Sequence, residues 1–210
     1  MSKLYGFRIK DGERIAEIGG GEGDLSKFIK SKGLNVVAFM EPRIYNLSKL
    51  SEWLGTDTKC IQMKVGDPNA GKALAKYMAN TIVLQDVIEH IATDALKDFL
   101  NDYRMAFGTL PRLIGRTPNL KSHYGLRNSF GDNTHLHRFT ERSLKDFLLD
   151  LGYGRICVKE EPYKITGLTS LLRYAPYKLT LLSLKIKMMI IYGQPEGPMS
   201  PNIVFDAEPT

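Results

Sequence analysis

The sequence predicts an α/β fold, a doubly wound and mostly parallel sheet of seven strands with a helical insert before the last strand. Two observations carry this prediction. Short apolar runs alternate along the chain with segments of helical periodicity, and polar clusters follow most of the apolar runs directly. The chain has 210 residues, of which 43% are apolar, and we expect one domain over residues 1–210.

The first expected unit is a strand, a glycine turn, a helix and a second strand within Arg14–Pro42. The apolar run that ends at Ile18 is typical of a central parallel strand. Glycines follow at once, and without a Cβ they let the backbone turn sharply close to a ligand. Apolar residues at i, i+3 and i+4 then predict a helix, and residues 35–40 form the next expected strand.

The later elements follow from the same two periodicities. Thr93 and Thr140 are each expected to cap a helix at its N-terminus. The helix after Thr140 carries apolar residues at i, i+3, i+4 and i+7, which predicts one buried face. The other expected elements are helices over 44–54 and 71–78 and strands over 59–65, 80–84, 112–116, 155–159 and 202–206.

The glycine spacing distinguishes two classes of nucleoside cofactor. An acid about 20 residues past a glycine turn is placed to bind ribose hydroxyls, and Glu41 has that place. The dinucleotide form G-x-G-x-x-G fails, because Asp24 stands at its sixth position. The form G-x-G-x-G fits Gly19, Gly21 and Gly23. Acidic Glu17 also suits the ammonium and sulfonium of S-adenosylmethionine, which we therefore expect over NAD. A glycine-rich turn of another α/β protein remains open.

Polar residues follow five of the expected strands. Because ligands of doubly wound sheets bind beyond the carboxyl ends of the strands, these residues are expected to converge on one site. They are Gly19–Gly23, Glu41, Asp67, the run Gln85-Asp86-Val87-Ile88-Glu89-His90, and Asn119.

With these motifs the chain resembles class I S-adenosylmethionine-dependent methyltransferases from about Arg14 to Asp206. EIGGGEG resembles their first motif, and LQDVIEHI resembles the fourth motif of ubiquinone-type members. The resemblance implies a Rossmann-like methyltransferase fold. It also implies cofactor binding by these residues: Glu17, Gly19, Gly21, Gly23, Glu41 for the ribose, Asp67 for the adenine amino group, Gln85 and Asp86.

The run RTPN, followed by GDNTHLHRFTERSLKDFLLDLGY, is similar to bacterial methyltransferases of capsule and lipopolysaccharide pathways. That similarity implies an enzyme that O-methylates a sugar or glycan intermediate in polysaccharide or glycosylated-metabolite biosynthesis. One departure concerns the N-terminus, since the family usually has a helical cap where only about 13 residues precede the first strand. The other departure is an unusual insert between the sixth and seventh expected strands.

A hydroxyl acceptor must lose a proton, and histidine is the commonest base for this work. His90 follows the fourth strand, whereas His123, His135 and His137 lie in the connection before Thr140, which we expect to be a long acceptor loop or lid. We expect His135 or His90 to be the catalytic base, with Asp132 orienting it or binding the acceptor. A purely structural His90, bonded to backbone at a helix start, remains open.

Acceptor binding is expected from Arg116, Arg127 and Arg138, which can hold a phosphate or carboxylate, and from Asn119. The alternative for the arginines is an ordinary solvated surface. Asp132 with His135 could ligate magnesium, but without a carboxylate cluster we expect no metal site.

The insert over 163–195 holds no Asp or Glu and mixes lysines with leucine, isoleucine and methionine. This composition suits a helix lying on an anionic membrane surface, which would fit a lipid-linked acceptor. A helix pair that packs into the core or dimerises is the favoured alternative. The first interpretation implies a peripheral contact with the inner membrane, and a dimerising helix pair implies a homo-oligomer.

Composition bounds the other possibilities. Cys60 and Cys157 match no metal or disulfide framework, no signal peptide or transmembrane run is visible, and we expect a cytoplasmic protein. The net charge of +6 selects no class of partner. The sequence lacks a basic stripe interleaved with aromatic residues and the Asn/Asp-Pro-Pro-aromatic motif of amino-group methylation, so we expect no nucleic-acid partner. The alternatives kept are methylation of a quinone precursor or phosphorylated metabolite, a catalytically silent subunit, and a nicotinamide oxidoreductase.

Overall fold

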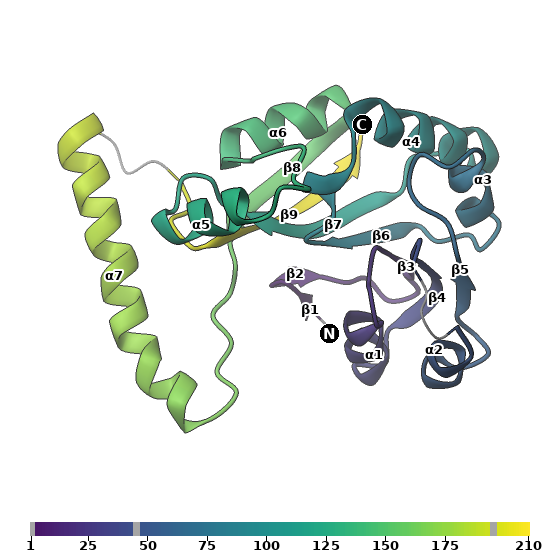
Figure 1. Ribbon diagram of the computed structural model, residues 1–210, viewed down its shortest axis with the longest axis horizontal. Coiled ribbons are helices and arrows are strands. Elements are labelled where there is room, and N and C mark those ends of the chain that lie inside the picture. Colours follow the sequence, from purple (N-terminus) through teal and green to yellow (C-terminus); the bar gives the residue numbers. More distant parts are fainter. Residues whose placement is uncertain (1–2, 44–46, 194–196) are drawn as a thin grey trace.

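The computed structural model describes residues 3–43, 47–193 and 197–210, without the side chains of Leu47 and Ser48. Its centre is a seven-stranded sheet in the order β5-β4-β3-β6-β7-β9-β8, in which β9 runs antiparallel to both of its neighbours (Figure 1). The strands are β3 Arg14–Ile18, β4 Asn35–Met40, β5 Lys59–Ile61, β6 Thr81–Gln85, β7 Arg112–Pro118, β8 Tyr153–Glu160 and β9 Asn202–Pro209. The predicted doubly wound, mostly parallel sheet is confirmed.

The strand order reverses beside β3, because β4 lies on one side of it and β6 on the other. A ligand crevice is expected at such a reversal, at the carboxyl ends of the strands. The helices are α1 Asp24–Ser31, α2 Leu47–Leu54, α3 Ala70–Ala75, the 3-10 turn η1 Ile88–His90, α4 Thr93–Phe107, α5 His123–Gly131, α6 Glu141–Asp150 and α7 Leu168–Tyr192.

Each face of the sheet has its own apolar core, because successive side chains of a strand point to opposite faces. On one face Ile82 and Leu84 of β6 pack with residues of α3, α4 and α6. On the other face Val83 packs with α1 and with a small hairpin, β1 Lys3–Leu4 and β2 Phe7–Arg8. This hairpin, rather than a helical cap, covers the sheet from the N-terminal side.

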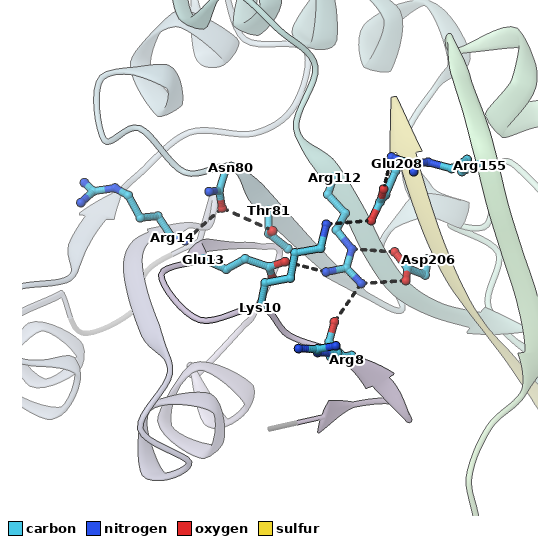
Figure 2. A network of polar contacts seen from close by, with 10 residues as sticks. All are labelled: Arg8, Lys10, Glu13, Arg14, Asn80, Thr81, Arg112, Arg155, Asp206 and Glu208. Carbon is cyan, nitrogen blue, oxygen red and sulfur yellow. Dashed lines mark hydrogen bonds and ion pairs between the residues drawn. The ribbon is translucent and has the colours of Figure 1, made fainter. Parts of the chain in front are cut away.

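A buried ion-pair network ties the N-terminal segment to the sheet (Figure 2). The Arg112 guanidinium donates to Glu13 at 2.7 Å, to both carboxylate oxygens of Asp206 at 2.7 Å, and to the Arg8 carbonyl at 3.0 Å. Paired in this way the buried charge is satisfied, and three distant parts of the chain meet at the start of β7.

Several expected boundaries were wrong. The strand expected over 59–65 ends at Ile61, and α4 begins at Thr93 itself, so Ala92 holds the N-cap position and the threonine lies in the first turn. The Thr140 cap is confirmed, since its hydroxyl accepts from the Ser143 amide at 3.2 Å. Residues 44–46 of the helix expected over 44–54 lie outside the described residues.

Two expectations about long connections also need correction. The connection before Thr140 is not one long loop, because α5 occupies residues 123–131, and only residues 119–122 and 132–139 stay irregular. The insert is not a helix pair but one helix of 25 residues, α7, which stands to one side of the body (Figure 1). No helix among the described residues is both long and apolar enough to cross a bilayer.

Candidate cofactor and acceptor site

Two adjoining pockets open at the carboxyl edge of the sheet. The first, of about 590 Å³, is called the glycine-side pocket, and Gly19, Glu41, Val65 and Leu136 are among the residues that line it. The second, of about 640 Å³, is called the histidine-side pocket, and its lining includes Glu89, Arg116, Arg127, Asp132 and His135. Asp86 and His90 line both pockets and therefore form their common wall.

The glycine turn adopts a conformation that requires glycine. Gly19, Gly21 and Gly23 have φ values of 70°, 56° and 78°, in the left-handed region. A Cβ on Gly19 would also lie 2.6 Å from a methyl carbon of Val87. Because the Gly19 amide donates to the Met40 carbonyl at 2.8 Å, the turn is fixed against the end of β4.

Glu41 lies at the rim of the glycine-side pocket, directly after β4. Its carboxylate accepts from the backbone amide of Gly21 at 3.1 Å through one oxygen and from that of Arg43 at 3.1 Å through the other. The acid is thereby held facing the glycine turn. It is in position to meet two vicinal hydroxyls of a ligand lying along the pocket.

Glu17 does not line this pocket. Its side chain is 1% exposed, lies under the turn and accepts a hydrogen bond from the Ser26 hydroxyl. Burial raises the pKa of Glu17 to about 7. A Cβ at Gly20 would come within 2.4 Å of its carboxyl group, so Glu17 supports the turn from below.

Asp67 and Gln85 are also absent from the pocket lining. The Asp67 carboxylate accepts from the Lys64 amide at 2.9 Å and closes the turn after β5, where Gly66 rather than the acid reaches the pocket. The Gln85 side chain turns toward the N-terminal hairpin and accepts from the Tyr5 hydroxyl. Neither side chain lines the glycine-side pocket in this structure, so their cofactor contacts stay predictions.

Asp86 is held in an unusual backbone conformation, with a φ of 53°. Its carboxylate receives two parallel hydrogen bonds from Arg116, one from Nε at 3.0 Å. Arg116 also donates to Glu161 at 3.0 Å. A strained residue that is over-determined by its partners is typical of functional sites. The two hydrogen bonds from Arg116 keep the Asp86 carboxylate fixed between the two pockets.

The expected catalytic residues come together in the histidine-side pocket. The rings of His90 and His135 meet edge to face with centroids 4.5 Å apart. Nδ1 of His135 lies 3.0 Å from the Ser129 carbonyl, and Nδ1 of His90 lies 3.0 Å from the Thr134 hydroxyl. Asp132 accepts from that hydroxyl at 2.6 Å, and its other oxygen is 3.9 Å from Nε2 of His135.

Glu89 is a buried acid that the sequence had shown only as part of the run 85–90. The side chain is 1% exposed, and burial raises the pKa of Glu89 to about 7. Its backbone carbonyl accepts from the amides of Leu136 and His137 at 2.8 and 3.0 Å, which pins the loop 132–139 beside η1. The sequence does carry one signal for this buried acid, because Glu89 stands next to apolar residues directly after the strand expected over 80–84.

The expected acceptor-binding residues divide into two groups. Arg116 and Arg127 line the histidine-side pocket. Arg138 does not, since it donates to the Ser129 carbonyl at 3.2 Å and lies over the Phe130 ring. Asn119 is fully buried and donates to the carbonyls of residues 198 and 200, so its role is to fix that segment.

The remaining two histidines lie outside both pockets. His137 contacts the Thr93 hydroxyl at 3.4 Å and packs against the rings of Phe139 and Phe147. His123 is exposed at the first position of α5. These positions separate His123 and His137 from the pair that lines the histidine-side pocket.

No protein-family model matches the chain, and no curated protein matches it. Solved structures do. A SAM-dependent methyltransferase from Archaeoglobus fulgidus is 16% identical, with 95% of this chain and 87% of that chain covered and a TM-score of 0.57. A Burkholderia thailandensis 1,6-didemethyltoxoflavin N1-methyltransferase, solved with 1,6-didemethyltoxoflavin and S-adenosylhomocysteine, is 13% identical over 94% and 71%, with a TM-score of 0.57.

An O-methyltransferase from neocarzinostatin biosynthesis, solved with S-adenosylmethionine and 2-hydroxy-5-methyl naphthoic acid, is 12% identical over 94% of this chain and 49% of that chain, with a TM-score of 0.55. Together these similarities show that the chain has the Rossmann-like fold of S-adenosylmethionine-dependent methyltransferases. None of the three is described as acting on a glycan, so the narrower resemblance to capsule enzymes stays a prediction.

Proposed function

We propose that this protein is an S-adenosylmethionine-dependent O-methyltransferase. The observation that carries the proposal is the pair of pockets that share Asp86 and His90 at the carboxyl edge of the sheet. Methyl transfer needs the acceptor oxygen in line with the methyl carbon and in contact with it, and two adjoining pockets would hold the two ligands next to each other. Two solved structures of the same fold that hold S-adenosylmethionine or S-adenosylhomocysteine support this cofactor.

The cofactor would occupy the glycine-side pocket. The glycine turn would lie against its amino-acid moiety and Glu41 would accept the ribose hydroxyls, since the carboxylate already faces the turn. Met63 and Val65 supply apolar surface beyond the acid, where an adenine ring would pack. The reactive methyl group would then point toward the His90 wall.

The acceptor would occupy the histidine-side pocket, and a sugar or glycan intermediate fits its chemistry best. The lining is rich in charged and amide side chains, namely Asp86, Arg116, Arg127, Asn128, Asp132 and Asn202. A polyhydroxylated acceptor satisfies such groups, whereas a flat apolar acceptor would leave them unpaired. Either arginine could also hold a phosphate on the acceptor.

In the transfer, the acceptor oxygen forms a bond to the methyl carbon while the carbon–sulfur bond breaks, and the sulfonium leaves as a neutral thioether. The hydroxyl proton must depart at the same stage. We assign its removal to the pair His90 and His135. Asp132 orients His90 through the Thr134 hydroxyl, and the Ser129 carbonyl orients His135. Such assistance is typically worth about 10²–10⁴-fold in rate.

Calorimetric titration with S-adenosylhomocysteine tests the cofactor part. We expect one site per chain, and failure to bind both this product and S-adenosylmethionine would overturn the proposal. A screen for S-adenosylhomocysteine release with sugar nucleotides, lipid-linked sugars, phenolic quinone precursors and phosphorylated metabolites then tests the acceptor. Turnover only on the last two classes would overturn the glycan assignment, and binding without any turnover would favour a silent subunit.

We also propose that α7 holds the enzyme against an anionic membrane surface. Of its 25 residues only Leu181 is buried, and the exposed apolar residues are Leu168, Leu171, Leu172, Tyr174, Leu179, Leu182, Ile186, Met189, Ile190, Ile191 and Tyr192. No acidic residue interrupts the basic ones between positions 163 and 195. Exposed apolar surface with positive charge is the composition that an anionic bilayer binds.

The place of α7 beside the acceptor pocket supports the same idea. A groove of about 630 Å³ lies between α7 and α5, lined by Tyr177 and Leu181 on one side and Tyr124 on the other. It shares Arg127 and Asn128 with the histidine-side pocket. A lipid-linked acceptor could therefore reach the site along α7 without leaving the bilayer surface.

A further inference from the structure

Glu89 is the starting point, because it is a buried carboxylate without a well-formed hydrogen bond among the described residues. It is 1% exposed, and neither carboxylate oxygen makes a well-formed hydrogen bond among the described residues, although the buried Thr117 hydroxyl lies close enough to favour its ionised form. Buried carboxylates are normally paired, hydrogen-bonded or bound to a metal, since burial without compensation costs several kcal/mol. The other buried glutamates have clear partners: Ser26 for Glu17, Arg112 for Glu13, and the amides of Gly21 and Arg43 for Glu41.

Two imidazole rings face this carboxylate. One nitrogen of His90, one of His135 and a carboxylate oxygen of Glu89 all lie within 4.8 Å of one another. Among the residues that the structure describes, this is the one cluster of three potential metal ligands at such a spacing. It lies on the histidine-side pocket, and His90 extends it to the glycine-side pocket.

The hydrogen bonds around the rings determine which nitrogens are free. The Ser129 carbonyl can only accept, so Nδ1 of His135 carries the proton that bonds it. The single hydroxyl proton of Thr134 is donated to Asp132, so Nδ1 of His90 must donate to the threonine oxygen. In the neutral form of both rings, Nε2 therefore keeps a lone pair. Histidines that ligate metals in proteins are fixed in this same way by their other nitrogen.

We propose that Glu89, His90 and His135 bind one divalent first-row transition-metal ion, such as Zn²⁺ or Mn²⁺, at the wall between the two pockets. Two imidazole nitrogens and one carboxylate oxygen are a donor set for such ions, with further positions left for water or a substrate. Mg²⁺ prefers an all-oxygen shell and binds this set more weakly. Ligand bonds of about 2.0–2.2 Å bring ligand atoms to roughly 3.4 Å apart, so the side chains close on the ion.

The ion would help the acceptor hydroxyl to lose its proton in the proposed reaction, and this step rests on the proposed function. With the ion bound, the two ring nitrogens are occupied, so the ion would replace the histidine pair as the group that promotes proton loss, and the acceptor hydroxyl would take an open coordination position. Coordination lowers the pKa of a hydroxyl. The hydroxyl proton would then pass to the Asp132 carboxylate and on to solvent, while the oxygen bonds to the methyl carbon and the carbon–sulfur bond breaks to give the neutral thioether.

Calorimetric titration of Zn²⁺ and of Mn²⁺ into chelator-treated, full-length protein without a polyhistidine tag tests the site. We expect one ion per chain with a Kd well below about 1 mM, and clearly weaker binding of Mg²⁺. Glu89→Gln, His90→Asn and His135→Asn should each weaken binding by at least about tenfold. His123→Asn is the matched control, because His123 is exposed outside the cluster, and it should bind as the original chain does.

Two results would overturn the site. One is no binding of either ion to the original chain, and the other is binding that all three substitutions leave unchanged. His90 is only half-buried, so His90→Asn keeps the test valid if Glu89→Gln fails to fold. Binding of S-adenosylhomocysteine is measured on the same preparations. A protein that binds the ion but not the nucleoside refutes the proposed function alone, and the reverse refutes the metal site alone.

Discussion

Arg116 and Asp86 meet at the carboxyl ends of adjacent parallel strands, where the guanidinium donates to the carboxylate with two nitrogens, the Nε bond measuring 3.0 Å. The pair fixes the wall that both pockets share. Neither residue could be assigned this partner from the chain alone, because they lie 30 positions apart in the sequence. Several of the following predictions depend on such tertiary pairings.

Arg116→Met should destabilise the protein by about 1–2 kcal/mol, because it leaves the carboxylates of Asp86 and Glu161 without their cation. Urea unfolding measures the change. Arg155→Met is the matched control: its side chain is 79% exposed in its pair with Glu208, and its loss should cost about 0.5 kcal/mol or less. Equal losses in the two variants would contradict a structural role for the Arg116 pair.

Glu17→Gln should change the pH dependence of stability. The folded chain holds the Glu17 proton up to about pH 7, whereas the unfolded chain releases it near pH 4.5. Stability therefore falls as the pH rises between these values and is level above them. At about 1.4 kcal/mol per pKa unit the fall reaches about 3 kcal/mol.

The glutamine variant keeps an acceptor for Ser26 and lacks that titration. Urea unfolding from pH 4 to pH 8 should therefore show the variant gaining stability over the original chain as the pH rises. A constant difference across this range would show that Glu17 is not buried in its protonated form.

Glu41→Ala should weaken binding of S-adenosylhomocysteine by about 10–100-fold, since hydrogen bonds to a charged acceptor are worth about 1.5–3 kcal/mol. Glu22→Ala is the matched control, because Glu22 is exposed in the same turn and lines neither pocket. Calorimetry provides both affinities. An equal effect of the two substitutions would indicate a general charge effect rather than a ribose contact.

Asn119→Ala should destabilise the fold by about 1–3 kcal/mol, because two buried carbonyls at positions 198 and 200 lose their donor.

Arg127→Ala, in contrast to Asn119→Ala, should leave the unfolding midpoint almost unchanged and raise KM for the acceptor, since that side chain is exposed on the pocket wall. Thermal melts and steady-state kinetics separate the two. A stable Asn119→Ala variant with a raised KM would restore the acceptor-binding role expected from the sequence.

Leu172→Glu together with Ile190→Glu should abolish flotation with anionic vesicles, because these side chains are 69% and 77% exposed on α7. The matched control is Met105→Glu, a similar change at a side chain 79% exposed on α4. Vesicles of neutral lipid should bind less of the original chain. No flotation of the original chain with phosphatidylglycerol vesicles would remove the membrane proposal.

Elements with a strong local signal were predicted well from the sequence. The glycine turn and the strand before it were found because glycine conformations and apolar runs are local properties. The Thr140 cap was found for the same reason. The 25-residue length of α7 and the helix hidden between β7 and Thr140 were missed, because exposed helices with mixed faces give weak periodicity.

The site shows the same division between local and tertiary information. The chain by itself determined the glycine turn, the acid after β4 and the order of strands that brings Asp86 and His90 to one edge, since these depend on spacing and on strand direction. Only the tertiary structure decided which polar side chains enter the pockets. Glu17, Asn119 and Gln85 turn to buried partners, and Glu89 lies beside two imidazoles without a well-formed hydrogen bond among the described residues, because side-chain direction depends on neighbours that are distant in sequence.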